Sequence, residues 1–237
     1  MQIPDSVVLI AGGTGGLGQA VGLAFLAACA KVIVTYRREE EFVALKGEAG
    51  VHASALEGIQ ADVTDLAAVA QLTNSITRRH GRLDALVNTV GGYAGGLPLW
   101  QTDPKVFERM LTLNLCSGYV LSRAVVPVML QQGRGVIINI ASRAAVDHAA
   151  GAAAYAVSKA AAVAMIDSLA ADLHGTGVRA NSILPSIFDT EANRRAMPKA
   201  DFAKWPKPEE IAKVILFLCS DDAKLIHGAS IPVYGST

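Results

Sequence analysis

Three side chains in the second half of the chain combine types and spacing that suit acid–base chemistry. Tyr155 and Lys159 are four residues apart in the helical run YAVSK, so both side chains lie on one face of the expected helix. An ammonium beside a phenol favours the phenolate and lowers the phenol pKa from about 10. Ser142 ends the apolar run VIINIAS, and the carboxyl edge of a parallel sheet would bring it close to Tyr155. Alone, the Tyr–Lys pair is usually a helix surface contact; with Ser142 it predicts proton transfer to or from a substrate oxygen.

A glycine-rich turn follows the first apolar run. The run VVLIA leads into GGTGGLG, and a helical pattern resumes after it. We expect Gly12, Gly16 and Gly18 to give a tight turn, an open approach for phosphate and a close helix–strand contact, with Gly13 and Gly15 as further relief. A flexible turn is the alternative, but the flanking strand and helix favour a dinucleotide whose pyrophosphate binds at the helix N-terminus. The predicted contacts are Gly12, Thr14, Gly15, Gly16, Leu17 and Gly18.

The end of the second apolar run, VTYRREEE, bears on which dinucleotide binds. Tyr36 is followed by Arg37 and Arg38, and no acidic residue stands between Tyr36 and Glu39. A carboxylate there favours the ribose 2′-hydroxyl of NAD(H), whereas guanidinium groups bind a 2′-phosphate. In the alternative, both arginines form a solvated helix start and pair with residues 39–41. We expect NADP(H) to be favoured over NAD(H), with Tyr36, Arg37 and Arg38 at the adenosine ribose.

Apolar β-rich runs alternate with longer helical patterns along the chain. Short continuous apolar runs are typical of strands covered on both faces, and their alternation with helices predicts right-handed βαβ units. The expected fold class is α/β, a doubly wound parallel sheet of about seven strands with helices on both faces, in a single domain over residues 1–237. Strands are expected at 7–11, 32–36, near 58–61, 83–88, 135–141, 178–184 and 229–234, and helical patterns at 65–81, 105–130 and 152–175.

The composition favours a folded protein and argues against several functions. Of the 237 residues, 51% are hydrophobic and 18% are charged, so disorder is not expected. The 21 basic and 21 acidic residues balance, which argues against nucleic-acid binding. No run of about 18 apolar residues predicts a membrane span. The three cysteines are far apart without metal-ligand spacing, which predicts free thiols, no metal and a reducing compartment. The start of the chain lacks a basic signal region, so we expect a cytoplasmic protein.

Several motifs occur in an order that resembles the short-chain dehydrogenase/reductase family over nearly the whole chain. AGGTGGLG is similar to the glycine turn of that family, ADVTD to its adenine-contacting segment and LVNTVGG to the segment after its fourth strand. NLCSG carries the helix asparagine, Asn114, which completes a tetrad with Ser142, Tyr155 and Lys159. The resemblance implies a Rossmann fold and hydride transfer between a nicotinamide dinucleotide and a carbonyl or alcohol substrate.

The resemblance also implies a role for each member of the tetrad. Tyr155 would give a proton to the substrate oxygen as hydride arrives, or remove it in the reverse direction. Lys159 would lower the tyrosine pKa and hold the nicotinamide ribose. Ser142 would orient the carbonyl, and Asn114 would support a water that links Lys159 to solvent. The further cofactor contacts implied are Asp62, Val63, Asn88, Gly91, Tyr155, Lys159, Pro185, Ile187 and Thr190.

Two positions depart from the family pattern. The usual second asparagine after the fourth strand is Thr89, which puts its strand-bracing role in doubt. The usual Pro-Gly after the sixth strand is Pro185–Ser186, so the backbone near the nicotinamide is expected to differ.

A short loop, about residues 186–206, fills the position of the substrate loop. Together with GGYAGG it resembles the loops of dihydropteridine reductase, so a flat pterin could lie against Tyr93 or Trp205 with its polar edge on Asn193 or Arg194. In the alternative, the polar residues of the loop fix its fold by bonding one another. The predicted substrate contacts are Tyr93, Ser142, Asn193 and Trp205.

The catalytic residues fit a general NADPH-dependent carbonyl reductase better than a pterin reductase, because pterin reductases typically favour NADH and lack the active-site serine. A 3-oxoacyl-thioester reductase is another enzyme alternative. A non-catalytic nucleotide sensor or scaffold would not need Ser142, Tyr155 and Lys159, and all three are present.

Self-association is expected as well. The pattern at 105–130 is apolar beyond what one sheet face covers, and the helix at 152–173 carries small residues on several sides. We expect a homodimer or homotetramer that acts on a small molecule, while packing within one chain is the alternative.

Overall fold

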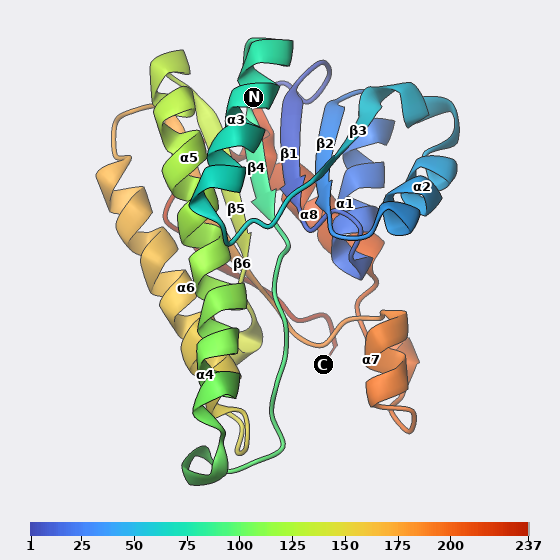
Figure 1. Cartoon of the computed structure of the whole chain (residues 1–237), viewed down its shortest axis with the longest axis vertical. Helices are drawn as coiled ribbons and strands as arrows, with labels where there is room; N and C mark the ends of the chain where they lie inside the picture. The colour runs from blue at the N-terminus through green and yellow to red at the C-terminus, as the bar shows by residue number, and fades with distance from the viewer. Residues whose placement is uncertain (237) are drawn as a thin grey trace.

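Seven parallel strands form one sheet in the computed structural model, which describes residues 1–236 (Figure 1). The strand order is β3-β2-β1-β4-β5-β6-β7, so the chain builds outward from β1 to one edge and then from β4 to the other. All neighbouring strands run parallel. The doubly wound α/β class expected from the sequence is confirmed. The strands are β1 Val7–Ala11, β2 Lys31–Tyr36, β3 Leu56–Gln60, β4 Ala85–Asn88, β5 Gly135–Ile140, β6 Val178–Pro185 and β7 Ser230–Val233.

Helices cover both faces of the sheet (Figure 1). On one face α1 and α8 pack together with α2 beside them, and on the other lie α3, α5 and α6. The short helix α7 stands apart, near the C-terminal end of the chain (Figure 1). The helices are α1 Gly16–Ala27, α2 Glu39–Glu48, α3 Leu66–His80, α4 Pro104–Leu111, α5 Ser117–Gln132, α6 Ala153–Asp172, α7 Glu191–Ala196 and α8 Pro208–Cys219.

The first strand explains why the strands read as unbroken apolar runs. Val8 and Ile10 belong to the core beneath α1 and α8, whereas Val7, Leu9 and Ala11 belong to the core beneath α3, α5 and α6. All five are buried. Because successive side chains of a strand point to opposite faces, a sheet covered on both sides selects apolar residues at every position.

The helix expected over 105–130 is interrupted. α4 ends at Leu111, a π-helical turn spans Thr112–Cys116, and α5 begins at Ser117. A π turn places an extra residue in the helix and is often found at functional sites. Here the turn contains Asn114, whose side chain is buried.

Two helical stretches are long and apolar enough to cross a membrane by length and composition alone. They are Pro104–Gln132, with a mean hydropathy of 1.4, and Ala153–Asp172, with 1.3. Both stretches supply residues to the core on one face of the sheet, which accounts for part of their apolar surface. The absence of a membrane span stays a prediction.

Candidate active site

The glycine turn joins β1 to α1 and leaves the start of that helix without a side-chain cap. Gly12 has φ +75°, which L side chains rarely adopt, and a Cβ on Gly18 would lie 2.2 Å from the Gly12 carbonyl oxygen. Gly15 is the N-cap residue, and neither a side-chain cap nor an acidic residue occupies the first turn. The free N–H groups and the positive end of the helix dipole therefore fit the pyrophosphate of a dinucleotide.

Thr89 braces this turn from the neighbouring strand. Its Oγ1 donates to the carbonyl oxygen of Ala11 at 2.7 Å and lies 3.1 Å from that of Gly12. Its backbone N–H also bonds Ala11, at 3.0 Å. The threonine thus ties the segment after β4 to the end of β1, and the doubt about strand bracing at this position is removed.

Ser142 and Tyr155 meet just beyond the carboxyl end of β5. Ser142 caps a 3₁₀ turn, Arg143–Ala145, by accepting from Ala144 N–H at 3.2 Å, and its hydroxyl also bonds the Tyr155 hydroxyl. Burial raises the pKa of Tyr155 above its usual value of 10.0, and the bond to Ser142 opposes that rise only in part. The lowered tyrosine pKa expected from the sequence is therefore wrong for this structure, because burial outweighs the effects that favour the phenolate.

The Lys159 ammonium is buried and turned toward the sheet. Its Nζ donates to the carbonyl oxygen of Ile140 at 2.8 Å, and the side chain comes from α6 one turn after Tyr155. Burial lowers the pKa of Lys159 to about 8. The backbone of Gly91 lies close by, since a Cβ there would stand 3.1 Å from Nζ. At neutral pH this lysine holds a positive charge directly under the segment after β4.

Asn114 is held in place by bonds to two other segments. Its Oδ1 accepts from Gly92 N–H at 2.9 Å, while its Nδ2 donates to the Gly92 carbonyl at 3.0 Å and to Ser158 Oγ at 2.9 Å. Ser158 in turn donates to the Tyr155 carbonyl at 2.7 Å. The π turn therefore fastens the loop after β4 to the helix that carries Tyr155 and Lys159. Sequence analysis missed Ser158, although its place between those two residues was a usable signal.

The segment after β2 contains an ion pair that sequence analysis gave only as an alternative. Arg38 bonds the carboxylate of Glu41, whose other oxygen accepts from Thr14 Oγ1 at 3.0 Å. The bond to Arg38 lowers the pKa of Glu41. Arg37 is exposed and Tyr36 stacks on Phe42 with ring centroids 5.2 Å apart. The Thr14 hydroxyl, which we expected to contact a phosphate, thus bonds Glu41 of α2 in this structure.

The predicted adenine and ribose contacts lie after β3 and β4. Asp62 accepts from the N–H and hydroxyl of Thr64 at 2.9 and 2.7 Å, which lowers its pKa, and Val63 is buried. The Asn88 side chain is committed within the protein. Its Nδ2 donates to Asn139 Oδ1 at 3.0 Å, and its Oδ1 accepts from Val90 N–H at 3.2 Å.

The segment after β6 folds back to the glycine turn. A Cβ on Gly16 would lie 2.8 Å from Thr190 Cγ2, which brings two predicted cofactor residues together. Pro185 ends β6, and the Ser186 hydroxyl donates to the Tyr234 carbonyl at 2.8 Å. The serine in place of the usual glycine therefore ties this segment to the chain after β7. Ile187 follows, half-buried.

Two of the predicted substrate residues lie in contrasting surroundings. Tyr93 is 67% exposed, and its ring stands edge-on to that of Tyr155. Trp205 is 7% exposed and packs on Phe202 with ring centroids 5.0 Å apart. Of these two residues, only Tyr93 has a described contact with Tyr155.

The substrate loop is held by bonds among its own residues. Asn193 Nδ2 donates to the Phe188 carbonyl at 2.8 Å, and Arg194 forms a two-point ion pair with Asp189. The Arg194 guanidinium also lies 5.0 Å from the centre of the Phe202 ring. These contacts favour the alternative in which the loop fixes its own fold.

This geometry agrees with comparisons to known proteins. A family model described as short chain dehydrogenase matches residues 6–201. The chain belongs to the short-chain dehydrogenase/reductase family. Its curated relatives include a D-threitol dehydrogenase of Mycolicibacterium smegmatis, 32% identical over 99% of this chain and 93% of the relative. They also include a 3-oxoacyl-(acyl-carrier-protein) reductase of Thermotoga maritima, 29% identical over 99% of this chain and 98% of the relative.

Two solved structures superpose closely on this one. A short-chain type dehydrogenase/reductase from Mycobacterium ulcerans has a TM-score of 0.94 at 26% identity, covering 100% of this chain and 90% of its own. ElxO with NADP bound has a TM-score of 0.92 at 26% identity, covering 98% of both chains. The protein is a short-chain NAD(P)-dependent oxidoreductase that acts on alcohol or carbonyl substrates.

Proposed function

We propose that the protein is an NADP(H)-preferring carbonyl reductase in which Tyr155 is the general acid, and the base in the reverse direction. The observation that carries the proposal is the grouping of Ser142, Tyr155 and Lys159 next to the loop after β4. Because its pKa is raised, the Tyr155 phenol stays protonated at neutral pH, which suits proton donation to a carbonyl oxygen.

Each member of the tetrad has a separate task in this proposal. Ser142, bonded to the Tyr155 hydroxyl, orients the substrate oxygen toward the phenol. Lys159 contributes a fixed positive charge and hydrogen-bond donors for the nicotinamide ribose. Asn114 is a positioning residue, because its bonds to Gly92 and Ser158 set the distance between the loop and α6; we also propose that it supports a water reaching Lys159.

A bound nicotinamide dinucleotide supplies or accepts the hydride. The free N–H groups of the glycine turn would hold its pyrophosphate. The segments after β2, β3, β4 and β6 would hold the remaining parts of the cofactor. The contacts proposed are Gly12, Thr14, Gly15, Gly16, Leu17, Gly18, Tyr36, Arg37, Arg38, Asp62, Val63, Asn88, Gly91, Tyr155, Lys159, Pro185, Ile187 and Thr190.

The preference for NADP(H) rests on the two arginines after β2 and is opposed by Glu41. Arg37 and Arg38 are exposed guanidinium groups at the expected position of the 2′-phosphate. Glu41 already bonds Arg38, so a 2′-phosphate must share or displace that carboxylate. Glu40 also lies 3.7 Å from Arg38, so these two carboxylates balance the two arginines, and we expect a smaller selectivity for NADPH than the arginines alone would give.

For the substrate, we favour a small ketone or aldehyde over a pterin. The D-threitol dehydrogenase and the 3-oxoacyl reductase among the relatives support a polyol or ketose, and after it a 3-oxoacyl thioester. The pterin alternative depends on the loop, and there Asn193, Arg194 and Trp205 are engaged with the loop itself. Tyr93 and Ser142 are the substrate contacts that we retain.

The test is NADPH oxidation with a four-carbon ketose, a 3-oxoacyl thioester and quinonoid dihydropterin, each repeated with NADH. Tyr155→Phe should lower kcat by a factor of about 100 or more while NADPH still binds. Thr112→Val is the matched control. It also removes one hydroxyl, but that hydroxyl donates to the Glu108 carbonyl within the helix and contacts no member of the tetrad. Turnover with dihydropterin alone would put the pterin alternative first. NADPH binding without turnover of any carbonyl would favour a sensor or scaffold.

We further propose that the single domain of residues 1–237 forms a homodimer or homotetramer in the cytoplasm. α5 and α6 leave apolar side chains exposed, among them Tyr119 at 51%, Leu130 at 43% and Val157 at 46%. Light scattering during size-exclusion chromatography tests this proposal, and a monomer at micromolar concentration would contradict it.

A further inference from the structure

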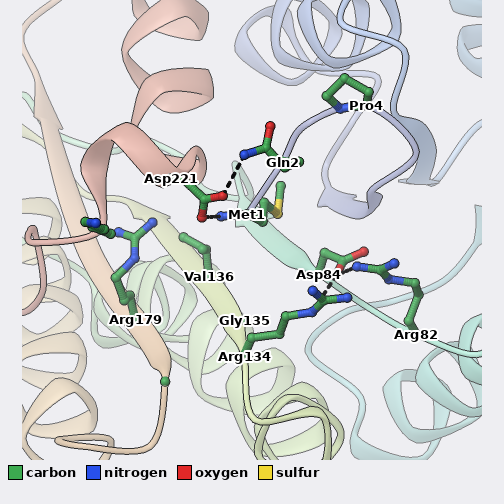
Figure 2. A pocket seen from close by; sticks show the side chains of 12 residues that line it. Met1, Gln2, Pro4, Arg82, Asp84, Arg134, Gly135, Val136, Arg179 and Asp221 are labelled. Atoms are coloured by element: carbon green, nitrogen blue, oxygen red, sulfur yellow. Dashed lines mark hydrogen bonds and ion pairs between the residues drawn. The ribbon is translucent and has the colours of Figure 1, made fainter.

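A concave site lies at the end of the sheet where the strands begin (Figure 2). The cavity has a volume of about 510 Å³, within the usual range for small-molecule pockets. It is lined by residues at or shortly before the starts of β1, β4, β5 and β6, and by residues in and next to the 3₁₀ turn after α8. Tyr155 and its partners lie beyond the carboxyl ends of the strands, so the cavity and the candidate active site are at opposite ends of the strands.

Two arginines converge on one buried carboxylate in this cavity (Figure 2). Asp84 is 1% exposed and bonds Arg82, while Arg134 Nε lies 3.9 Å from the same carboxylate. Asp84 also accepts from Val7 N–H at 2.9 Å. Within residues 1–236, the buried Nε of Arg82 has no hydrogen-bond partner. Two donors thus bond the carboxylate, Arg134 adds a longer ion pair, and the Arg82 Nε–H remains free to bond a ligand.

Two further cations line the cavity, of which Arg179 interacts electrostatically with Asp221 but forms no ion pair with it. Arg179 donates to the carbonyl oxygens of Leu218 and Ile226 at 2.8 and 2.9 Å, so its charge is held in place but not neutralised there. Lys224 is exposed, and the described part of the chain offers its ammonium no hydrogen bond or ion pair.

The other lining carboxylate is already neutralised. Asp221 pairs with the amino group of Met1 and accepts from Gln2 Nε2 at 3.0 Å (Figure 2). Once that pair is set aside, one negative charge remains in the lining, that of Asp84. The remaining positive charges are those of Arg82, Arg134, Arg179 and Lys224. The lining therefore carries a formal excess of three positive charges.

We propose that this cavity binds a small anion with a diphosphate group. Guanidinium groups match phosphate oxygens in two-point bonds, and Lys224 adds a mobile donor at the rim. A single phosphate group carries a charge of about −1.5 to −2 near neutral pH, which is less than the excess in the lining. A diphosphate balances that excess more closely, and a cavity of this size admits it with room for an attached organic group.

The test is calorimetric titration of inorganic pyrophosphate into the protein at low salt, after the glycine turn has been filled with one equivalent of NADPH per chain. NADPH is included because pyrophosphate also suits the glycine turn of the active site, and NADPH blocks that turn. We expect about one pyrophosphate to bind per chain, with an affinity that falls as salt is added.

The decisive variant is Arg134→Gln with Lys224→Gln, since both side chains are exposed and neither is needed for packing. It should bind pyrophosphate at least tenfold more weakly than the wild type, with NADPH binding unchanged. Lys46→Gln with Lys213→Gln is the control, because it removes the same charge at exposed positions outside the lining. Lys224→Glu alone should weaken binding in the same direction.

Two outcomes would overturn the proposal. One is a wild-type protein that binds no pyrophosphate once NADPH is present. The other is an equal loss of pyrophosphate affinity in the Arg134/Lys224 variant and in the Lys46/Lys213 control. That result would show that the affinity depends on the net charge of the protein and not on the cavity. Neither outcome depends on the substrate of the active site, so the proposed reductase activity and the anion site fail independently.

Discussion

The Tyr93 ring stands edge-on to the Tyr155 ring, with centroids 5.0 Å apart and the ring planes at 72°. An aromatic pair in this geometry is worth about 0.5–1.5 kcal/mol beyond area burial. Tyr93→Ala should therefore raise the KM for the carbonyl substrate by a factor of about two to ten, since Tyr93 also offers the substrate an exposed aromatic face. Tyr93→Phe should keep the KM near its wild-type value. A Tyr93→Ala variant with unchanged KM would exclude Tyr93 from the substrate site.

In the proposed cofactor site, Glu41 would compete with a 2′-phosphate for Arg38. Glu41→Gln removes the negative charge while keeping a side chain that can still bond Thr14. The ratio of NADPH to NADH affinity should rise by a factor of about two to five, the range expected for an exposed ion pair. Fluorescence titration of both cofactors measures the ratio, with Glu39→Gln as the control on the same helix. A ratio that falls would mean that Glu41 itself assists phosphate binding.

The buried Lys159 ammonium makes stability depend on pH in a defined direction. Its pKa is about 8 in the folded protein and 10.5 when exposed, so the unfolded state holds more protons between these values. The cost of burying the charge is fully present below pH 8, and it is relieved as the pH rises toward 10.5. Between those limits the wild type should gain up to about 3 kcal/mol of unfolding free energy relative to Lys159→Met.

Urea denaturation of both proteins at pH 7.5 and pH 10 measures that difference. The comparison with Lys159→Met removes the contributions of all other titrating groups. Parallel changes in the two proteins would show that the lysine is neutral, or well solvated, throughout this range.

The Thr89 hydroxyl braces two strands by bonding the carbonyls of Ala11 and Gly12. Thr89→Val keeps the shape and removes the donor, so the unfolding free energy should fall by about 1 kcal/mol. Thr89→Ser keeps the donor and should retain more of that stability. NADPH affinity should also drop in Thr89→Val, because the turn proposed to bind the pyrophosphate is less firmly held. Equal stabilities for the Val and Ser variants would contradict the bracing role.

The strands and most helices could be predicted because local patterns decide them. The inner strands are largely apolar on both faces, and each strand boundary fell within two residues of the prediction; the boundaries of α3 and α6 fell within three. The order of the family motifs was equally informative, since it brought Ser142, Tyr155 and Lys159 to one edge of the sheet.

Features that depend on tertiary contacts could not be predicted. The apolar pattern continues through residues 105–130 without a sign of the π turn, which is accompanied by the bonds from Asn114 to Gly92 and Ser158. The loop after β6 is a second case. An aromatic residue such as Trp205 is equally suited to a ligand platform or a buried anchor, and only its contact with Phe202 decides between them.

The two outer strands of the sheet carry residues that discourage further strand addition. The carbonyls of Ala229, just before β7, and of Val233, at its end, accept from Ser182 and Ser186 on the side of β6. By alternation, Pro232 turns its nitrogen toward the open edge. Proline has no N–H to offer an incoming strand, and Glu57 places a charge in β3 at the other edge. Both edges of the sheet are thereby poor templates for an incoming strand, which lowers the tendency of the folded protein to aggregate through them.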